Sequence, residues 1–278
     1  MAEDRGPSPP ASKGAGPLAP RDLVRDLHHL GVALGETLLV HTSLRALARG
    51  RLVLGGPVGV ILALQDAVGP EGLLLMPTFT APNREPRFWS NPPVPEAHWA
   101  AIRAGWPAFR KDRTPSFGVG RVPEVFRGLE DVVRSEHPQQ SFAAWGSRAA
   151  WLAKGQPLVD AFGEASPLRR LEDDDGRVLM LGTGWGAFTA FHLAERRMAR
   201  PLPQVDEGAA MLDAAGVRRW RSFRAHGYRA DDFHRLGRDL EATNPEWIRR
   251  GRVGEAQSRL VRVRPAIAAA TRWLDRHR

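Results

Sequence analysis

The chain has 278 residues, of which 42% are hydrophobic, so it is long enough to bury a full core. It contains no cysteine, which excludes disulfide frameworks, cysteine-ligated zinc sites and any acyl-cysteine intermediate. Its 40 Lys and Arg residues outnumber 31 acidic residues, giving a formal net charge of +9. The basic residues are scattered and follow no nucleic-acid-binding motif, so we expect no nucleic-acid partner.

The chain begins with a stretch that predicts no packed structure. Residues 1–20 are rich in Pro, Ala and Gly and lack the apolar core of a signal peptide, so we expect a disordered tail. No run approaches the roughly 18 apolar residues of a membrane helix. We therefore expect a cytoplasmic protein without a membrane partner, folded as one domain over residues 21–278.

The first elements indicate an α/β fold. Apolar residues at helical spacing from Leu23 predict a helix that ends at Gly31. "TLLVHTSL" and "GLLLMPTFT" then read as two buried strands, each ending in hydroxyl side chains. Between them, "GGPVGVILALQDAVG" predicts a helix. A strand, helix and strand in this order predict a parallel pair.

From Ala81 to Pro115 the periodicity disappears and Pro and Trp dominate. Such a stretch is typical either of a lid that covers a binding site or of an irregular surface excursion. Further along, we predict short helices over Pro123–Leu129 and Ala143–Lys154. "RVLMLG" predicts a third buried strand, followed by a loop and a helix over Phe188–Met198.

The last part of the chain mixes strands and helices. Strands are predicted around Trp220 and Phe223, and a helix over Asp231–Glu241. The strand "RLVRV" and a final helix near Trp273 complete the pattern, which contains no internal repeat. The sequence predicts a mixed or parallel central sheet with flanking helices.

The stretch "LMLGTGWGAFTAFHLAE" resembles the glycine fingerprint of dinucleotide-binding proteins, because Gly182, Gly184 and Ala187 have the right spacing. That fingerprint also requires a second buried parallel strand ending in an acid. Here the helix leads into "RPLPQVDEG", whose prolines and few apolar residues argue against a buried strand. We therefore expect no dinucleotide site.

The same stretch places His192 and Glu195 on one face of a helix, three residues apart. The helix begins just past the carboxyl end of a strand, where open α/β sheets bind ligands. If the three strands are neighbours, their ends bring His192 near two groups of hydroxyls: Thr42-Ser43, and Thr78 with Thr80. A histidine that only packs or caps is the alternative. Metal-ligand spacing and a serine nucleophile elbow are both missing from the sequence, so we expect no metal.

Several long segments, in matching order from about Leu34 to Leu274, resemble the aminoglycoside 3-N-acetyltransferases, the antibiotic N-acetyltransferase family that is distinct from the GNAT fold. They include "HTSLRAL", "GGPVGVILALQDAVGPEGLLLMPTFT", "RTPSFGVGRVPEVFR", "RSEHPQQSFAAWG" and "VLMLGTGWGAFTAFHLAE". The resemblance implies transfer of an acetyl group from acetyl-CoA to the 3-amino group of a 2-deoxystreptamine antibiotic. It also implies that the "HLAE" histidine, His192, is a general base.

The resemblance assigns acetyl-CoA binding to the hydroxyl-rich loops, which contain Thr42, Ser43, Leu44, Thr78, Thr80, Ser116, Phe117 and Gly118. Turn or capping roles are the alternative for each Ser and Thr. Glu195 would orient His192 or bind the ammonium groups of the substrate. The lack of cysteine favours direct attack of the amine on the thioester. Donors for the oxyanion are expected among Thr42-Ser43, Thr78 and residues 116–118.

The predicted substrate contacts are mostly acidic. Aminoglycosides are polycations, which favours acidic contacts, and the candidates for substrate binding are Glu96, Trp99, Glu164 and Asp232. The chain is basic, however, with Arg110-Lys111 after "PAF". A different amine, such as a natural-product intermediate, is therefore the second hypothesis. We expect a monomer or a homodimer.

Overall fold

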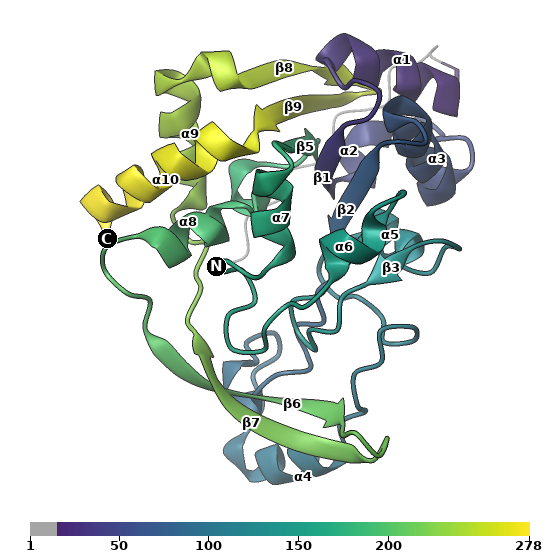
Figure 1. Ribbon diagram of the computed structural model, residues 1–278. Coiled ribbons are helices and arrows are strands. Elements are labelled where there is room, and N and C mark those ends of the chain that lie inside the picture. Colours follow the sequence, from purple (N-terminus) through teal and green to yellow (C-terminus); the bar gives the residue numbers. More distant parts are fainter. Residues whose placement is uncertain (1–15) are drawn as a thin grey trace.

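The computed structural model describes residues 16–278, which form a seven-stranded sheet with helices on both faces (Figure 1). In spatial order the strands are β3 (Val133–Arg134), β4 (Phe142–Trp145), β2 (Leu73–Pro77), β1 (Thr37–Thr42), β5 (Arg177–Leu181), β9 (Ala256–Arg262) and β8 (Ile248–Val253). The sheet is mixed, in agreement with the α/β class predicted from the sequence.

The centre of the sheet is parallel. Strand β1 pairs with β2 through Thr37 and Leu73, and with β5 through Leu38 and Arg177. Antiparallel strands flank this triplet, β4 beside β2 and β9 beside β5. The predicted adjacency of the three buried strands is therefore confirmed, and their carboxyl ends meet at one edge of the sheet.

Alternation along the strands divides the core in two. Leu39 and Leu75 pack on one side with α6 (Ala149–Ala153), α7 (Pro167–Asp173), α8 (Phe191–Arg197), α9 (Phe233–Thr243) and α10 (Val263–His277). Leu38 and Leu74 pack on the other with α1 (Pro20–Leu30), α2 (Leu44–Ala48), α3 (Gly56–Val68) and α5 (Arg121–Phe126). Because both faces are covered, the middle residues of the central strands β1, β2 and β5 are apolar and buried.

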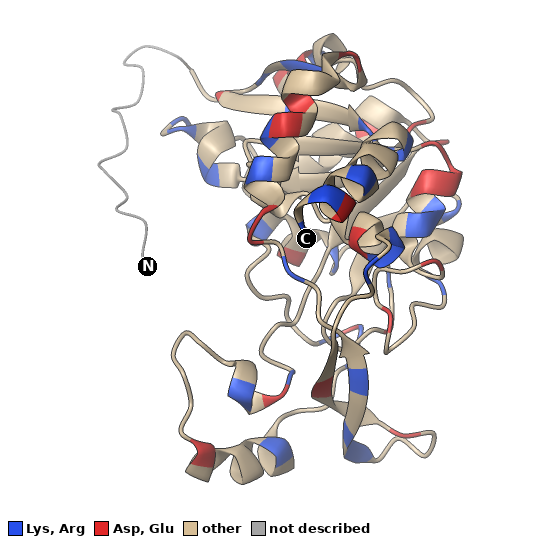
Figure 2. Ribbon diagram, turned by 90° about the vertical axis from the view of Figure 1, so that its left-hand side faces the viewer, with Lys and Arg blue, Asp and Glu red and all other residues tan. Residues whose placement is uncertain are grey.

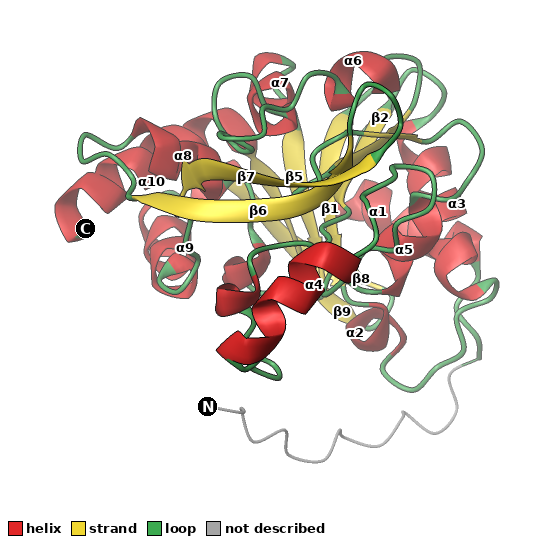
Figure 3. Ribbon diagram, turned by 90° about the horizontal axis from the view of Figure 1, so that it is seen from below, coloured by secondary structure: helices red, strands yellow, loops and turns green. Residues whose placement is uncertain are grey.

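A second unit lies beyond one end of the sheet (Figures 1 and 3). It combines the ribbon of β6 (Gln204–Leu212) and β7 (Arg218–His226) with η1 (Pro86–Phe88), η2 (Glu96–His98) and α4 (Trp99–Gly105). Asn83 ties the stretch 81–115 to the ribbon, since its side chain donates to the carbonyl of Ala210 (3.2 Å) and accepts from the N–H of Ala210 (2.9 Å). The stretch 81–115 is mostly irregular, as its missing periodicity predicts.

Two sequence predictions are wrong in detail. Ala143–Lys154 is not one helix: β4 comes first, then Gly146 with a φ of 117°, then α6. A Cβ at Gly146 would lie 2.2 Å from the Gly72 carbonyl, so the chain turns where the sheet needs close approach. A strand does follow the prolines at 201 and 203, with Gly208–Ala210 buried. It belongs to the separate ribbon, so the dinucleotide fold is still excluded.

The predicted disordered tail is partly ordered. Residues 1–15 lie outside the described residues, but Leu18 is buried and pairs with the backbone beside Val53. Ordered structure thus begins inside the stretch 1–20. Within residues 16–278, no helix has the length and apolar character needed to cross a membrane. Figure 2 shows basic and acidic positions interspersed over the sheet, its helices and the second unit.

Candidate active site

A cleft of about 540 Å³ lies at the carboxyl ends of β1, β2 and β5. It brings together residues distant in the sequence, because these three strands are neighbours. Its lining comprises Val40, His41, Thr42, Ser43, Leu44, Arg45, Pro77, Phe79, Gly118, Val119, Gly120, Arg121, Pro123, Thr183, Gly186, Ala187, Thr189, His192 and Phe233. Of the predicted site residues, the cleft therefore unites His192 with Thr42, Ser43, Leu44 and Gly118.

His192 and Glu195 form a direct pair. Nδ1 of His192 contacts Oε2 of Glu195, and the Glu195 side chain is fully buried while 14% of the His192 side chain is exposed. Since an ionised carboxylate only accepts hydrogen bonds, Nδ1 is the protonated nitrogen of this contact, and the lone pair of a neutral ring is then on Nε2. The imidazole thus has the tautomer that a general base requires.

Aromatic rings fix the orientation of the imidazole. Phe162 stacks on His192 with ring centroids 4.6 Å apart and 13° between the planes. The ring centroids of Tyr228 and Phe233 lie 5.4 and 4.9 Å from that of His192. The hydroxyl of Tyr228 donates to Asp160 (2.6 Å). Burial, and to a lesser extent this hydrogen bond, raise the pKa of Tyr228.

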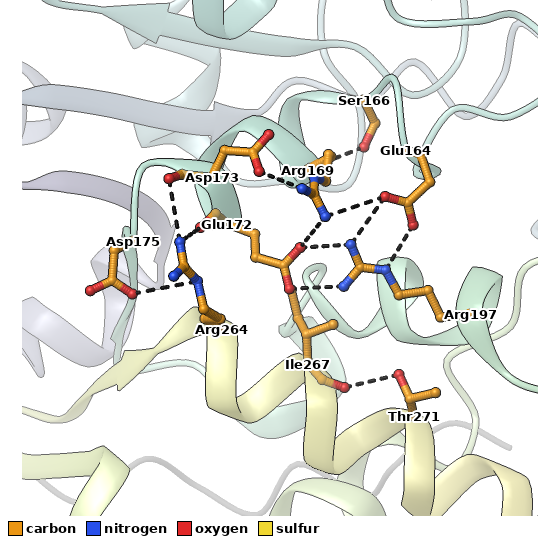
Figure 4. Close-up of polar contacts among 10 residues, drawn as sticks. All are labelled: Glu164, Ser166, Arg169, Glu172, Asp173, Asp175, Arg197, Arg264, Ile267 and Thr271. Atoms are coloured by element: carbon orange, nitrogen blue, oxygen red, sulfur yellow. Dashed lines mark hydrogen bonds and ion pairs between the residues drawn. The ribbon is translucent and has the colours of Figure 1, made fainter.

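An ionic cluster anchors the helix that carries the pair (Figure 4). Arg197 of α8 donates to Glu172 of α7 at 2.8 and 2.6 Å and to Glu164 at 2.7 and 3.1 Å. The hydrogen bonds from Arg197 lower the pKa of Glu164. Arg264 of α10 donates to the Glu172 carbonyl (3.1 Å), so three helices meet at this cluster.

The segment that follows the stretch 81–115 reaches the cleft through Gly118, whose φ of 77° favours glycine. Two positions earlier, Ser116 donates from its N–H and its hydroxyl to Glu124 (2.7 and 2.6 Å). Burial raises the pKa of Glu124, but hydrogen bonds from Arg127 and Ser116 outweigh it and lower the pKa to about 2. Phe117 is 60% exposed.

Two of the predicted hydroxyls turn away from the cleft. Pro77 and Phe79 line it, and the alternation of an extended chain points Thr78 and Thr80 the other way. Thr78 exchanges hydrogen bonds with Ser141 and accepts one from the buried Arg134 (3.1 Å). Thr80 donates to the Pro138 carbonyl. Both hydroxyls therefore have internal partners.

Two other hydroxyls in the cleft have no such partner. The Oγ1 atoms of Thr42 and Thr183 are buried and make no hydrogen bond with any described residue. Both residues line the cleft, at the ends of β1 and β5. A buried hydroxyl without a partner is uncommon, and at a cleft it indicates a place for a polar ligand. Neighbouring Ser43 instead caps α2 by accepting from the Ala46 N–H (3.2 Å).

A second cavity, of about 420 Å³, adjoins the first at Phe79, which lines both. Its walls come from the stretch 81–115, from the ribbon and from the segments around residues 139–140, 158–161 and 227–228, and they include Arg84, Phe88, Glu207 and Tyr228. His192 lines the first cavity, and its ring contacts Tyr228, which lines the second. Arg84 pairs with Glu207, and Arg196 donates to Asp160 (2.9 Å). Both carboxylates are thus neutralised by arginines.

The predicted substrate contacts lie outside both linings. Glu96 is exposed on η2, and Trp99 of α4 donates to the Val94 carbonyl (3.1 Å). Glu164 belongs to the cluster of Figure 4, and Asp232 pairs with Arg278. Among residues 16–278, no group of three or more His, Asp or Glu is arranged to hold a metal ion.

Sequence reasoning missed Phe162, Tyr228 and Arg278, which surround the His192–Glu195 pair. They are 30 or more positions away from it or from one another, so no local spacing could reveal them. One compositional signal existed, since Tyr228 is the only tyrosine of the sequence. A single residue of a rare type does not by itself indicate a site.

Comparison with known proteins gives a consistent result. The family model described as aminoglycoside 3-N-acetyltransferase matches residues 39–275. The chain is 36% identical over 258 residues to the SPbeta prophage-derived aminoglycoside N(3')-acetyltransferase-like protein YokD of Bacillus subtilis (strain 168), covering 92% of each. It is 39% identical to aminoglycoside N(3)-acetyltransferase VIII of Streptomyces fradiae, over 76% of this chain and 72% of the relative.

Solved structures of related proteins have the same fold as this chain. The crystal structure of YokD from Bacillus subtilis matches with a TM-score of 0.88 and 36% identity, over 94% of each chain. AAC-IIIb, solved as a binary complex with CoASH, matches with a TM-score of 0.81 and 30% identity, over 93% of this chain and 97% of that one. AAC-VIa bound to sisomicin matches with a TM-score of 0.82 and 31% identity, over 94% of this chain and 98% of that one.

Proposed function

Because the chain belongs to the aminoglycoside 3-N-acetyltransferase family, whose members are acyltransferases, we propose that it transfers the acetyl group of acetyl-CoA to the 3-amino group of a 2-deoxystreptamine aminoglycoside, with His192 as general base. Such a reaction would confer resistance to the antibiotic. The observation that carries the proposal is the position of His192, which is paired with Glu195, lines the first cavity and contacts Tyr228 of the second.

The first cavity is suited to acetyl-CoA. The buried, unpartnered hydroxyls of Thr42 and Thr183 offer donors to the amides of a pantetheine arm or to the thioester oxygen. Gly118 and Gly120, both with positive φ, let that arm approach the backbone closely. The related AAC-IIIb was solved with CoASH bound. Arg45 and Arg121 of the lining suit its phosphates.

The chemistry follows from the pair. A neutral amine attacks the thioester carbon, and Nε2 of His192 takes the proton that the nitrogen loses. Glu195 stabilises the resulting imidazolium through its Nδ1–H. The C–S bond then breaks, and the imidazolium returns the proton to the departing thiolate. The amide and free CoA are the products, and no covalent enzyme intermediate is needed.

The second cavity would hold the amine substrate. Its walls include Ala81, Arg84 and Phe88, so the stretch 81–115 is proposed to act as a lid over this substrate. The related AAC-VIa was solved with sisomicin bound. With the two substrates entering from different sides, the nitrogen and the thioester carbon meet beside His192, which avoids competition between them.

The test is a panel of aminoglycosides with and without the 3-amino group. We expect acetyl-CoA to release free thiol with the 2-deoxystreptamine compounds, with one added acetyl group by mass spectrometry and its position at N3 by NMR. Acetylation of another nitrogen would overturn the regiochemistry. The absence of thiol release with every aminoglycoside would overturn the substrate.

A second candidate is an N-acetyltransferase of this family that acts on a different amine. It is favoured by the pairing of Glu207, the carboxylate in the lining of the second cavity, with Arg84. Asp160, which accepts from Tyr228 of that lining, is likewise paired with Arg196. A polycation needs carboxylates whose charge is not already compensated. Thiol release with monoamines but with no aminoglycoside would support this candidate.

A further inference from the structure

The C-cap residue of α10, Arg278, reaches the pair on α8. Its Nη1 contacts Oε1 of Glu195, the carboxylate oxygen that does not contact His192. The backbone N–H of Arg229 donates to the same oxygen (3.2 Å). The guanidinium also makes a two-point contact with Asp232, from Nε at 2.8 Å and from Nη2 at 2.5 Å. Only 4% of the Arg278 side chain is exposed.

This guanidinium is held firmly in its charged form. Burial lowers the pKa of Arg278, but hydrogen bonds to Asp232 and Glu195 outweigh it and raise the pKa. Burial raises the pKa of Asp232, and the contacts with Arg278 again outweigh it and lower the pKa. A buried, two-point arginine–carboxylate pair has a fixed geometry. Arg278 is thus a rigid positive charge beside Glu195.

Other charged and titratable groups approach the pair from the elements around it. Arg196 of α8 pairs with Asp160, and Tyr228 donates to that same carboxylate. His41 of β1 accepts from the Thr189 N–H just before α8 (3.4 Å). Asp232 lies on the far side of Arg278. Among the described residues, Arg278 is the arginine whose side chain directly contacts the Glu195 carboxylate.

We propose that Arg278 is a positioning residue for the His192–Glu195 pair, which holds Glu195 ionised and aimed at Nδ1 and thereby keeps the imidazole free to accept a proton. The inference deepens the proposed function and rests on it, because it concerns the same base. It assigns a role in the reaction to a residue that contacts no substrate.

The physical consequence is a change in titration. A buried carboxylate without its cation favours taking up a proton or sharing one with its neighbour. Without the Arg278 charge, the His192–Glu195 pair as a whole would hold an extra proton up to a higher pH. A unit charge at this range, with solvent screening, shifts such a titration by about half to one pH unit. Asp232, left without its cation, acts in the same direction.

The test compares Arg278→Gln with wild type in the pH profile of kcat/KM. We expect the acidic limb to move up by about half to one pH unit, so that activity below the limb falls by roughly three- to tenfold. Arg278→Lys keeps the charge but cannot form both contacts, and it should retain the wild-type limb with a lower plateau. The matched control is Arg197→Gln, which removes an equally ion-paired arginine from α8 itself and should leave the limb in place.

A second readout separates this inference from the proposed function. NMR of protein labelled with ¹⁵N-histidine follows protonation of the His192 ring without any substrate. If the ring titration moves up in Arg278→Gln but the kinetic limb does not, the positioning role stands and the base is another group. If neither moves, or if Arg197→Gln moves both equally, the positioning role is wrong. Should Arg278→Gln fail to fold, a shifted limb in Arg278→Lys would itself contradict it.

Discussion

His41 and His137 are buried histidines that the fold holds neutral. Two backbone N–H groups, of Gln139 and Gln140, donate to Nδ1 of His137 at 3.1 and 3.0 Å. A proton on this nitrogen would break both bonds. Burial lowers the pKa of His137 to about 4, although the Leu158 carbonyl opposes it, and burial lowers the pKa of His41 to about 3.

The lowered pKa values of these two histidines predict that the folded protein loses stability in mild acid. Each folded pKa is below the unfolded value near 6.5, so the unfolded chain binds more protons as the pH falls. Stability should be full above pH 6.5 and decline toward pH 4, by roughly 1.4 kcal/mol per pH unit for each histidine. Urea unfolding at several pH values measures this slope. His137→Gln should have a lower midpoint at pH 7 but a shallower slope. A slope equal to that of wild type would contradict the account of His137.

At the scale of residues, local spacing was informative only where the site is local. His192 and Glu195 lie one helical turn apart, so the sequence alone predicts that they share a face. Phe162, Tyr228 and Arg278 complete their surroundings through tertiary contacts. The same limit explains Thr78 and Thr80, whose direction depends on the phase of the chain after β2. Their proposed role in binding acetyl-CoA stays a prediction.

Among the elements, α5 holds the segment 116–118 in place through one carboxylate. Glu124 of α5 accepts from the Ser116 N–H and hydroxyl and from Arg127 Nε (2.8 Å). It thereby fixes the start of the segment 116–118, whose Gly118 lines the cleft.

Replacing Glu124 by Gln should loosen this segment without touching the base. The lost charge weakens hydrogen bonds worth about 1.5–3 kcal/mol each, so we expect KM for acetyl-CoA to rise about tenfold with kcat within a factor of two. The exposed Glu130, just after the same helix, provides the control, because Glu130→Gln should change neither constant. Steady-state kinetics decide the matter. A fall in kcat at constant KM would show that Glu124 acts otherwise.

The elements show what sequence can and cannot determine. β1, β2 and β5 have apolar centres, and a glycine lies shortly before each of them, so their existence and parallel pairing were predictable. The stretch Ala143–Lys154 was not, because "AAWGSRAAWLA" has good helix formers on both sides of Gly146. Pairing of β4 with β2 overrides that propensity. Strand β6 likewise forms because β7 lies beside it.

For the whole molecule, charge is the feature with a direct consequence. The net charge is +9, and Arg45 and Arg121 lie in the lining of the cleft proposed for acetyl-CoA. Long-range attraction of its phosphates is screened by salt over about 10 Å at 0.1 M. We therefore expect KM for acetyl-CoA to rise several-fold between low and high salt.

The control for this effect is a thioester without phosphates. Acetyl-pantetheine carries the same reacting group and arm but no charge, so its KM should be nearly independent of salt. Initial rates over a series of KCl concentrations measure both. An equal salt dependence for the two donors would place the phosphates away from these arginines.

The measurement that tests the role of His192 most directly is single-turnover transfer by His192→Gln. The amide keeps the size and hydrogen-bonding character of the ring but cannot take up the proton. With CoA affinity unchanged by calorimetry, we predict that the rate of acetyl transfer falls by about 10²–10⁴-fold and that its rise with pH through the acidic limb disappears. Transfer within a factor of ten of wild type, with that limb intact, would show that the amine loses its proton to another group.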